Sequence, residues 1–221
     1  MRLTFIQHAH YVGPGLIREF AEARGWVCDR TLTPEDLRSV ELESVVGDAV
    51  VFLGSLHGVY ETHIPWIARE RRLMRVLVAS SRPILGVCFG AQMLATALGG
   101  RVIPMPQPYQ GWHENEDAVD DLWRGPWLRW HGDRIFLPGS IEVLARNDET
   151  VQAFRHGCAV GVQFHPEVDE TVLTDWIDGR STSGSEPPEN LIRALRYADD
   201  HATEIHDRAF ALLDRIFAML T

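Results

Sequence analysis

One segment of the chain, PILGVCFGAQMLATALGG (Pro83–Gly100), runs from a buried-strand pattern into a helix pattern with no loop between them. Cys88 stands at the joint, and Gly86 and Gly90 stand two positions to either side of it. A turn this abrupt requires small neighbours, because larger side chains would collide with the crossing backbone. The segment therefore predicts a sharp strand–turn–helix that lifts the Cys88 thiol above the edge of a sheet.

Strand and helix patterns alternate in the first part of the chain. Apolar strands are expected at Leu3–Gln7, Trp26–Leu32, Asp48–Gly54 and Pro83–Val87, with helices at Leu16–Arg24 and Ile64–Ala79. A strand that is apolar throughout is covered on both faces, which is typical of parallel sheets. This order of elements predicts an α/β fold with an open, mostly parallel sheet flanked by helices.

The middle of the chain has a different pattern. Between Arg101 and Gly157, short apolar runs are broken by Pro, Gly and Asp, which predicts strands and hairpins, an added antiparallel region beside the parallel core. Cys158–Pro166 is a last apolar strand. An irregular loop is expected at Ser181–Asn190 and helices from Leu191 to Leu220.

Charge and cysteine content exclude several classes of protein. The formal net charge of −10 argues against a surface for nucleic acid or anionic membranes, which would need clustered Lys and Arg. MRLTFIQHAH at the N-terminus has no apolar run long enough for a signal peptide or a membrane span. Three cysteines form no disulfide framework, so we expect a cytoplasmic protein in which Cys28 and Cys158 are inert core thiols.

Cys88 taken alone is equally consistent with a core residue and with a nucleophile. A helix that begins at Phe89 would direct its free N–H groups at the sulfur, which favours the thiolate, and the Phe89 N–H could donate to an oxyanion. The distant QFHPEV segment adds His165 at the end of a strand and Glu167 two residues later. A cysteine nucleophile needs an imidazole base and a carboxylate to orient it, so these three residues form a candidate triad.

The motifs GVCFGAQ (Gly86–Gln92) and FHPE (Phe164–Glu167), in this order, resemble those of the class I glutamine amidotransferases. That resemblance extends from Leu3 to about Val168. It implies a flavodoxin-like fold with a nucleophile elbow, with Cys88 as nucleophile, His165 as general base and acid, and Glu167 as the residue that orients His165. We accordingly expect one domain over residues 1–221, with a catalytic core at 1–168 and a helical extension at 169–221.

Further positions match the same family. The FLGSLHG segment resembles the oxyanion loop that commonly reads Gly-Gly-Pro, and here the matching residues are Gly54, Ser55 and Leu56. The resemblance implies that the N–H groups of Ser55 and Phe89 form the oxyanion hole. It also implies that Gln92, and Gly132 and Asp133 in WHGD, contact the glutamine substrate. Within the family, QFHPE and WHGD resemble the glutaminase domain of GMP synthase, whereas the altered loop and the C-terminal helices depart from it.

The resemblance implies a glutaminase that supplies ammonia to a separate ATP-dependent synthetase and needs no cofactor. Two alternatives remain: a γ-glutamyl peptidase or hydrolase that uses the same triad, and a non-catalytic scaffold of the same fold. Histidines cluster at His8–His10, but no acidic or cysteine partner stands at a ligand spacing, so no metal site is expected. The partner enzyme and the acceptor of the ammonia are not encoded in these motifs.

Overall fold

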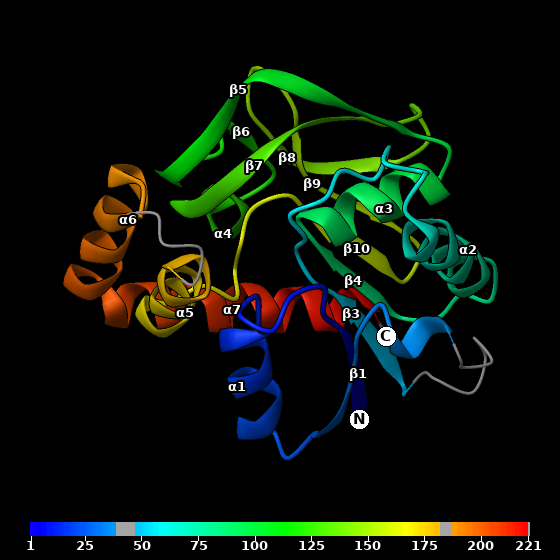
Figure 1. Ribbon diagram of the computed structural model, residues 1–221, viewed down its shortest axis with the longest axis horizontal. Helices are drawn as coiled ribbons and strands as arrows, with labels where there is room; N and C mark the ends of the chain where they lie inside the picture. The colour runs from blue at the N-terminus through cyan, green and yellow to red at the C-terminus, as the bar shows by residue number, and fades with distance from the viewer. Residues whose placement is uncertain (39–46, 182–186, 221) are drawn as a thin grey trace.

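The computed structural model describes residues 1–38, 47–181 and 187–220, and an eight-stranded sheet forms its centre (Figure 1). The sheet order is β2-β1-β3-β4-β10-β9-β8-β6. The first five of these strands are mutually parallel: β2 (Val27–Leu32), β1 (Arg2–Ile6), β3 (Ala49–Phe52), β4 (Ile84–Val87) and β10 (Ala159–Val162). The expectation of a mostly parallel sheet is therefore confirmed.

The middle of the chain contributes to two sheets. Three strands extend the main sheet in antiparallel fashion: β9 (Val151–His156), β8 (Glu142–Arg146) and β6 (Asp117–Ala118). The other two, β5 (Arg101–His113) and β7 (Trp127–Phe136), pair only with each other as an antiparallel ribbon.

Prolines explain why β5 stays outside the main sheet. Pro104, Pro106 and Pro108 recur at every second position of this strand, and each lacks the N–H that a ladder needs. The pairing with β7 is irregular between Pro104 and Tyr109, where these prolines lie. The ribbon bends over the main sheet and brings β7 near β10 (Figure 1), and the backbone N–H of His165 donates to the carbonyl of Leu128 in β7 at 2.9 Å.

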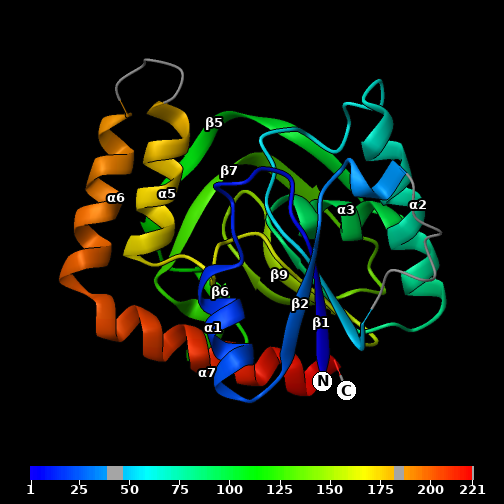
Figure 2. The same ribbon diagram turned by 60° about the horizontal axis from the view of Figure 1, so that its bottom comes forward.

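Helices cover both faces of the parallel strands. In β3, Val51 packs in one hydrophobic cluster, and Val50 and Phe52 pack in the other, as alternation along a strand requires. Figures 1 and 2 show α7 crossing one face near α1, while α2 and α3 lie on the other face. The longer helices are α1 (Gly15–Ala23), α2 (Pro65–Ala79), α3 (Phe89–Ala97), α5 (Glu170–Ser181), α6 (Glu189–Asp200) and α7 (Ala202–Leu220), and α4 (Asp121–Arg124) and the 3-10 turn η1 (Asp36–Arg38) are short.

The C-terminal segment differs from expectation at one point. The expected loop Ser181–Asn190 is shorter, because α5 continues to Ser181 and α6 begins at Glu189, and residues 182–186 of that loop lie outside the described residues. The helices expected from Leu191 onward are present as α6 and α7. No helix in the described part of the chain has both the length and the apolar composition that a bilayer crossing requires.

The prediction that Cys28 and Cys158 are core thiols is wrong. Both side chains are only half-buried. Cys28 lies in β2, which is an edge strand with mostly exposed side chains. Cys158 follows Gly157 in the turn before β10, outside the layer of buried strand residues. Apolar neighbours in the sequence identified the strands correctly but not the position of each strand in the sheet.

Candidate active site

Cys88 occupies the expected sharp turn between β4 and α3. Its backbone angles, φ 51° and ψ −105°, lie where a residue with a Cβ is strained by about 1–3 kcal/mol. The flanking glycines are required by close packing: a Cβ on Gly86 would lie 2.6 Å from the Gly90 carbonyl, and one on Gly90 would lie 2.3 Å from the Phe52 oxygen. The backbone is thus forced into a conformation that directs the Cys88 side chain at the carboxyl end of the sheet.

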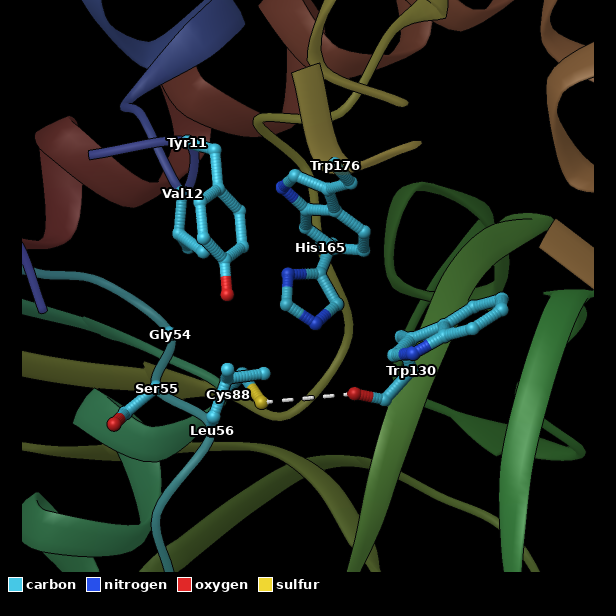
Figure 3. Close-up of a pocket in the computed structure, with 9 residues that line it drawn as sticks. All are labelled: Tyr11, Val12, Gly54, Ser55, Leu56, Cys88, Trp130, His165 and Trp176. Atoms are coloured by element: carbon cyan, nitrogen blue, oxygen red, sulfur yellow. Dashed lines mark hydrogen bonds between the residues drawn. The ribbon is translucent and has the colours of Figure 1, made fainter. Parts of the chain in front are cut away.

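His165 reaches Cys88 from the neighbouring strand. β10 pairs with β4 in parallel register, with Val162 opposite Val87, so the chain leaves both strands at the same edge. His165 follows three residues after Val162, and Figure 3 shows its imidazole and the Cys88 sulfur in one pocket. The edge of Trp176 packs on the imidazole, with ring centroids 5.1 Å apart. The sheet register therefore brings together two residues that are far apart in the sequence.

Glu167 completes a buried pair with His165. The Nδ1 atom of His165 lies 2.7 Å from Oε1 of Glu167, and the two side chains are 3% and 0% exposed. Burial alone lowers the pKa of His165, but the negative charges of Glu167 and Cys88 outweigh it and raise this pKa to about 10. His165 is therefore an imidazolium at neutral pH, with one N–H donated to Glu167. Within the described part of the chain, its Nε2 atom has no hydrogen-bond partner.

The loop Gly54–Leu56 runs beside Cys88 on the side of β3 (Figure 3). A Cβ on Gly54 would lie 3.5 Å from His165 Cε1 and 3.9 Å from Cys88 Cβ, so this backbone borders both side chains. Leu56, where relatives commonly carry proline, is 65% exposed. Among the described residues no group accepts from the Ser55 N–H, and the Phe89 N–H, at the first position of α3, has no partner within the helix. Two backbone donors thus remain available on either side of Cys88.

Two cavities meet at Cys88 and differ in character. The larger, about 290 Å³, is lined by polar groups that include Gln92, Gly132 and Asp133. The smaller, about 40 Å³, is walled by aromatic rings and contains the His165 imidazole (Figure 3). Its aromatic residues are Tyr11, Trp130 and Trp176. Ser55 and Cys88 line both cavities, so a molecule bound at the sulfur would extend into each of them.

The larger cavity contains polar atoms without partners. Gln92 donates from Nε2 to Gln163 at 3.3 Å, and its Oε1 is buried with no partner among the described residues. The same holds for Oδ1 of Asp133, whose pKa is raised by burial and held back by hydrogen bonds from Tyr60 and Gln92. His131, with a pKa lowered to about 3 by burial, is neutral and donates from Nδ1 to the Asp133 carbonyl at 3.1 Å. Buried oxygens without partners are sites for a ligand's N–H groups.

All nine residues singled out from the sequence lie at or beside this site. Cys88, Ser55 and Phe89 surround the sulfur, His165 and Glu167 form the buried pair, and Gln92, Gly132 and Asp133 line the larger cavity. Gly54 lines the smaller one. The sequence analysis did not identify Tyr11, Tyr60 or Trp176 as site residues and interpreted Trp130 as a packing residue. Trp130 was open to identification, because it directly precedes the HGD segment, whereas Tyr11 and Trp176 stand in no motif.

Comparisons with known proteins agree with this geometry. The family model described as Glutamine amidotransferase class-I matches residues 17–177. GMP synthase [glutamine-hydrolyzing] of Thermomicrobium roseum is 34% identical over 155 residues, which cover 64% of this chain and 27% of that protein. A shorter GMP synthase subunit from Methanococcus maripaludis is 30% identical over 149 residues, covering 63% of this chain and 76% of the relative. The chain therefore matches only about a quarter of the full-length GMP synthases, which are much longer.

Solved structures match over a larger share of the chain. A glutamine amidotransferase from Thermotoga maritima superposes with a TM-score of 0.82 and 25% identity, covering 98% of each chain. A glutamine amido transferase from Methylobacillus flagellatus, 20% identical, shares the fold with a TM-score of 0.82 over 100% of this chain and 95% of its own. Since the family model matches well over half of the residues, including the elbow and the buried pair, the chain belongs to the class I glutamine amidotransferase family.

Proposed function

We propose that this protein hydrolyses the side-chain amide of glutamine through a γ-glutamyl thioester on Cys88 and supplies the ammonia to a separate synthetase. The observation that carries the proposal is the buried His165–Glu167 pair, which shares the end of two adjacent strands with Cys88. A scaffold would have no use for this arrangement, because a buried charged pair beside a strained cysteine costs stability. Family membership supports the same chemistry.

The proposed reaction begins with the Cys88 thiolate. Its sulfur forms a bond to the amide carbon, and the carbonyl electron pair moves to the oxygen, where the N–H groups of Ser55 and Phe89 stabilise it. His165 donates its Nε2 proton to the amide nitrogen, the C–N bond breaks, and ammonia leaves. Neutral His165 then takes a proton from water, the resulting hydroxide attacks the thioester, and glutamate departs as the thiolate re-forms. Glu167 holds the Nδ1 proton throughout and stabilises the imidazolium.

The two cavities fix the direction in which glutamine would bind. The leaving nitrogen must lie within reach of His165 Nε2, and His165 lines the small aromatic cavity. The amino-acid end then lies in the larger cavity, where the unpartnered oxygens of Gln92 and Asp133 can accept from the α-ammonium group. Gly132 leaves the backbone open there. No cofactor is required for any of these steps.

The size of the smaller cavity favours glutamine over a γ-glutamyl peptide. One water needs roughly 10–15 Å³ of such space. A cavity of about 40 Å³ therefore accommodates ammonia together with a water but not an amino-acid leaving group. A γ-glutamyl peptidase using the same triad is thus the second candidate, and it would require the rings of Tyr11 or Trp176 to be displaced.

We further propose one domain over residues 1–221, with a core at 1–168 and the extension at 169–221. α5 of that extension contributes Trp176 to the site. The full-length likeness to a glutamine amidotransferase from Thermotoga maritima supports a unit that works beside a synthetase on another chain. The GMP synthase relatives match about two thirds of this chain, which supports a related glutaminase with a different C-terminal part.

The test is to incubate the purified protein with glutamine and to measure glutamate and ammonia, with Cys88→Ala as the control. We expect equal amounts of both products and no turnover by the variant. Equal activity of Cys88→Ala would overturn the proposed nucleophile. Efficient cleavage of γ-glutamyl peptides without cleavage of glutamine would instead establish the second candidate.

A further inference from the structure

A second buried histidine–carboxylate pair lies on the far side of the loop Gly54–Leu56. His8 follows β1, and Glu70 lies in α2; their side chains are 1% and 0% exposed. His8 Nε2 is 2.8 Å from Oε2 of Glu70, and His8 Nδ1 is 2.9 Å from the carbonyl oxygen of Gly54. The proposed mechanism uses neither side chain, yet one of them holds the backbone that borders Cys88.

The position of one proton follows from these partners. A carbonyl oxygen can only accept, so the 2.9 Å contact requires an N–H on Nδ1 of His8. This holds whether His8 is an imidazolium beside a charged Glu70 or a neutral ring that accepts from a protonated Glu70. Burial lowers the pKa of His8, but the charge of Glu70, its hydrogen bond and the backbone carbonyls of Gly54 and Leu53 outweigh it, so the pKa is raised. His8 is thus a fixed donor to Gly54.

Holding the Gly54 oxygen also sets the direction of the next N–H. The carbonyl of Gly54 and the N–H of Ser55 belong to one trans peptide, in which these two groups point in opposite directions. With the carbonyl directed at His8, the Ser55 N–H is directed away from it. Ser55 lines both cavities that meet at Cys88. Glycine at position 54 would otherwise allow this peptide to rotate, because it has no Cβ to restrict it.

The His8 ring is itself held on both sides. It stacks on Trp66 with ring centroids 5.1 Å apart and meets the edge of Phe89 at 4.9 Å. Phe89 supplies the second proposed oxyanion donor. His8 therefore contacts the residues of both donors, one through a backbone carbonyl and the other through a side chain.

We propose that His8 is a positioning residue for the oxyanion hole: its Nδ1–H, with the ring anchored by Glu70, orients the Gly54–Ser55 peptide so that the Ser55 N–H faces the bound carbonyl. This proposal rests on the proposed function, since it assumes attack by Cys88 on a carbonyl. In this loop the anchoring matters more than in Gly-Gly-Pro relatives, because Leu56 does not restrict the backbone as proline does.

Two amide variants separate the two hydrogen bonds of His8. The amide nitrogen of His8→Asn stands where Nδ1 stood and can still donate to Gly54, whereas that of His8→Gln stands where Nε2 stood and can serve only Glu70. Each variant, shown to be folded by circular dichroism, is treated with p-nitrophenyl acetate and separately with iodoacetamide, and modification of Cys88 is followed by peptide mass spectrometry. Acylation by the ester passes through an oxyanion, and alkylation by iodoacetamide does not.

We expect the ratio of acylation to alkylation rates to fall about 10- to 100-fold in His8→Gln and to stay within about 5-fold of wild type in His8→Asn. The same order is expected for kcat with glutamine, with KM nearly unchanged. An unchanged ratio in both variants, an equal loss in both, or a parallel loss of acylation and alkylation would overturn the proposal. A wild-type protein that is acylated by the ester but does not hydrolyse glutamine would refute the proposed function and leave this inference standing.

Discussion

His165 and Glu167 are two residues apart and bonded to each other, with 2.7 Å between Nδ1 and Oε1, although both side chains are buried. Pro166 between them ends the extended segment and turns Glu167 back toward the imidazole. Because the pair is excluded from water, its charge interaction is much stronger than that of an exposed ion pair. Three consequences for the proposed enzyme concern this pair and the neighbouring Cys88, and a fourth concerns the leaving-group cavity.

Glu167→Gln is expected to lower kcat by roughly 10²–10⁴-fold, because the amide can still accept the Nδ1 proton but no longer stabilises the imidazolium. KM for glutamine should change little, since Glu167 lines neither cavity. Steady-state kinetics measure both values. Glu170→Gln, an exposed position in the first turn of α5, is the matched control and should leave both unchanged. A wild-type kcat in Glu167→Gln would contradict the proposed role.

The same pair predicts a pH dependence of stability. The pKa of His165 rises from its ordinary value of 6.5 to about 10 in the folded protein, so the folded state binds this proton more tightly. The resulting stabilisation is complete below pH 6.5 and is lost as the pH rises toward 10. Urea denaturation of wild type and Glu167→Gln measures it: the difference in free energy of unfolding should be larger at about pH 6 than at about pH 9.5. A difference that is constant over this range would count against a charged pair.

The strained backbone at Cys88 predicts an unusual order of stabilities. Glycine ordinarily destabilises relative to alanine by about 0.5–1 kcal/mol. At φ 51° the Cβ of alanine is strained, so Cys88→Gly should be more stable than Cys88→Ala by about 1 kcal/mol. Ala68→Gly, at an exposed position in α2, is the control and should show the ordinary sign. Urea denaturation compares the pairs, and the same sign at both positions would argue against strain at the elbow.

Tyr11 is expected to limit the size of the leaving group, because its ring forms one wall of the small cavity and its hydroxyl points into it (Figure 3). Tyr11→Ala should raise the kcat/KM for γ-glutamyl methylamide, relative to that for glutamine, by about 10-fold or more. Tyr11→Phe keeps the ring and should keep the wild-type ratio. If the alanine variant discriminates as strongly as the wild type, the leaving group does not enter this cavity.

The parallel part of the fold was predictable because its strands are covered on both faces. Apolar runs such as Ala49–Phe52 carry that pattern locally, and the glycines around Cys88 mark the turn. The division of the middle region into two sheets was not predictable, since it depends on which distant strand offers a free edge to β9. The alternating prolines of β5 are a local signal of an edge strand, but they do not name its partner.

For the site, the sequence motifs predicted the residues around the sulfur, and the structure added those that act from a distance. His8 and Glu70 are separated by 62 positions, and neither stands in a motif, so their contact follows only from the packing of α2 against β1 and α3. Trp176 lies on a helix that was not distinguished within the extension. Neutral Trp and Tyr side chains carry no spacing that identifies a cavity wall, because most of them serve as core residues.

The register between β4 and β10 has a consequence for how such a protein diversifies. Cys88 and His165 are aligned by Val87 opposite Val162, so the long segment between them plays no part in setting their separation. That segment forms the ribbon of β5 and β7, which carries Trp130 and Asp133 to the cavities. Reactivity and selectivity are therefore encoded in separable stretches of the chain, and exchanging the ribbon offers a route to new substrates that leaves the bond-breaking machinery intact.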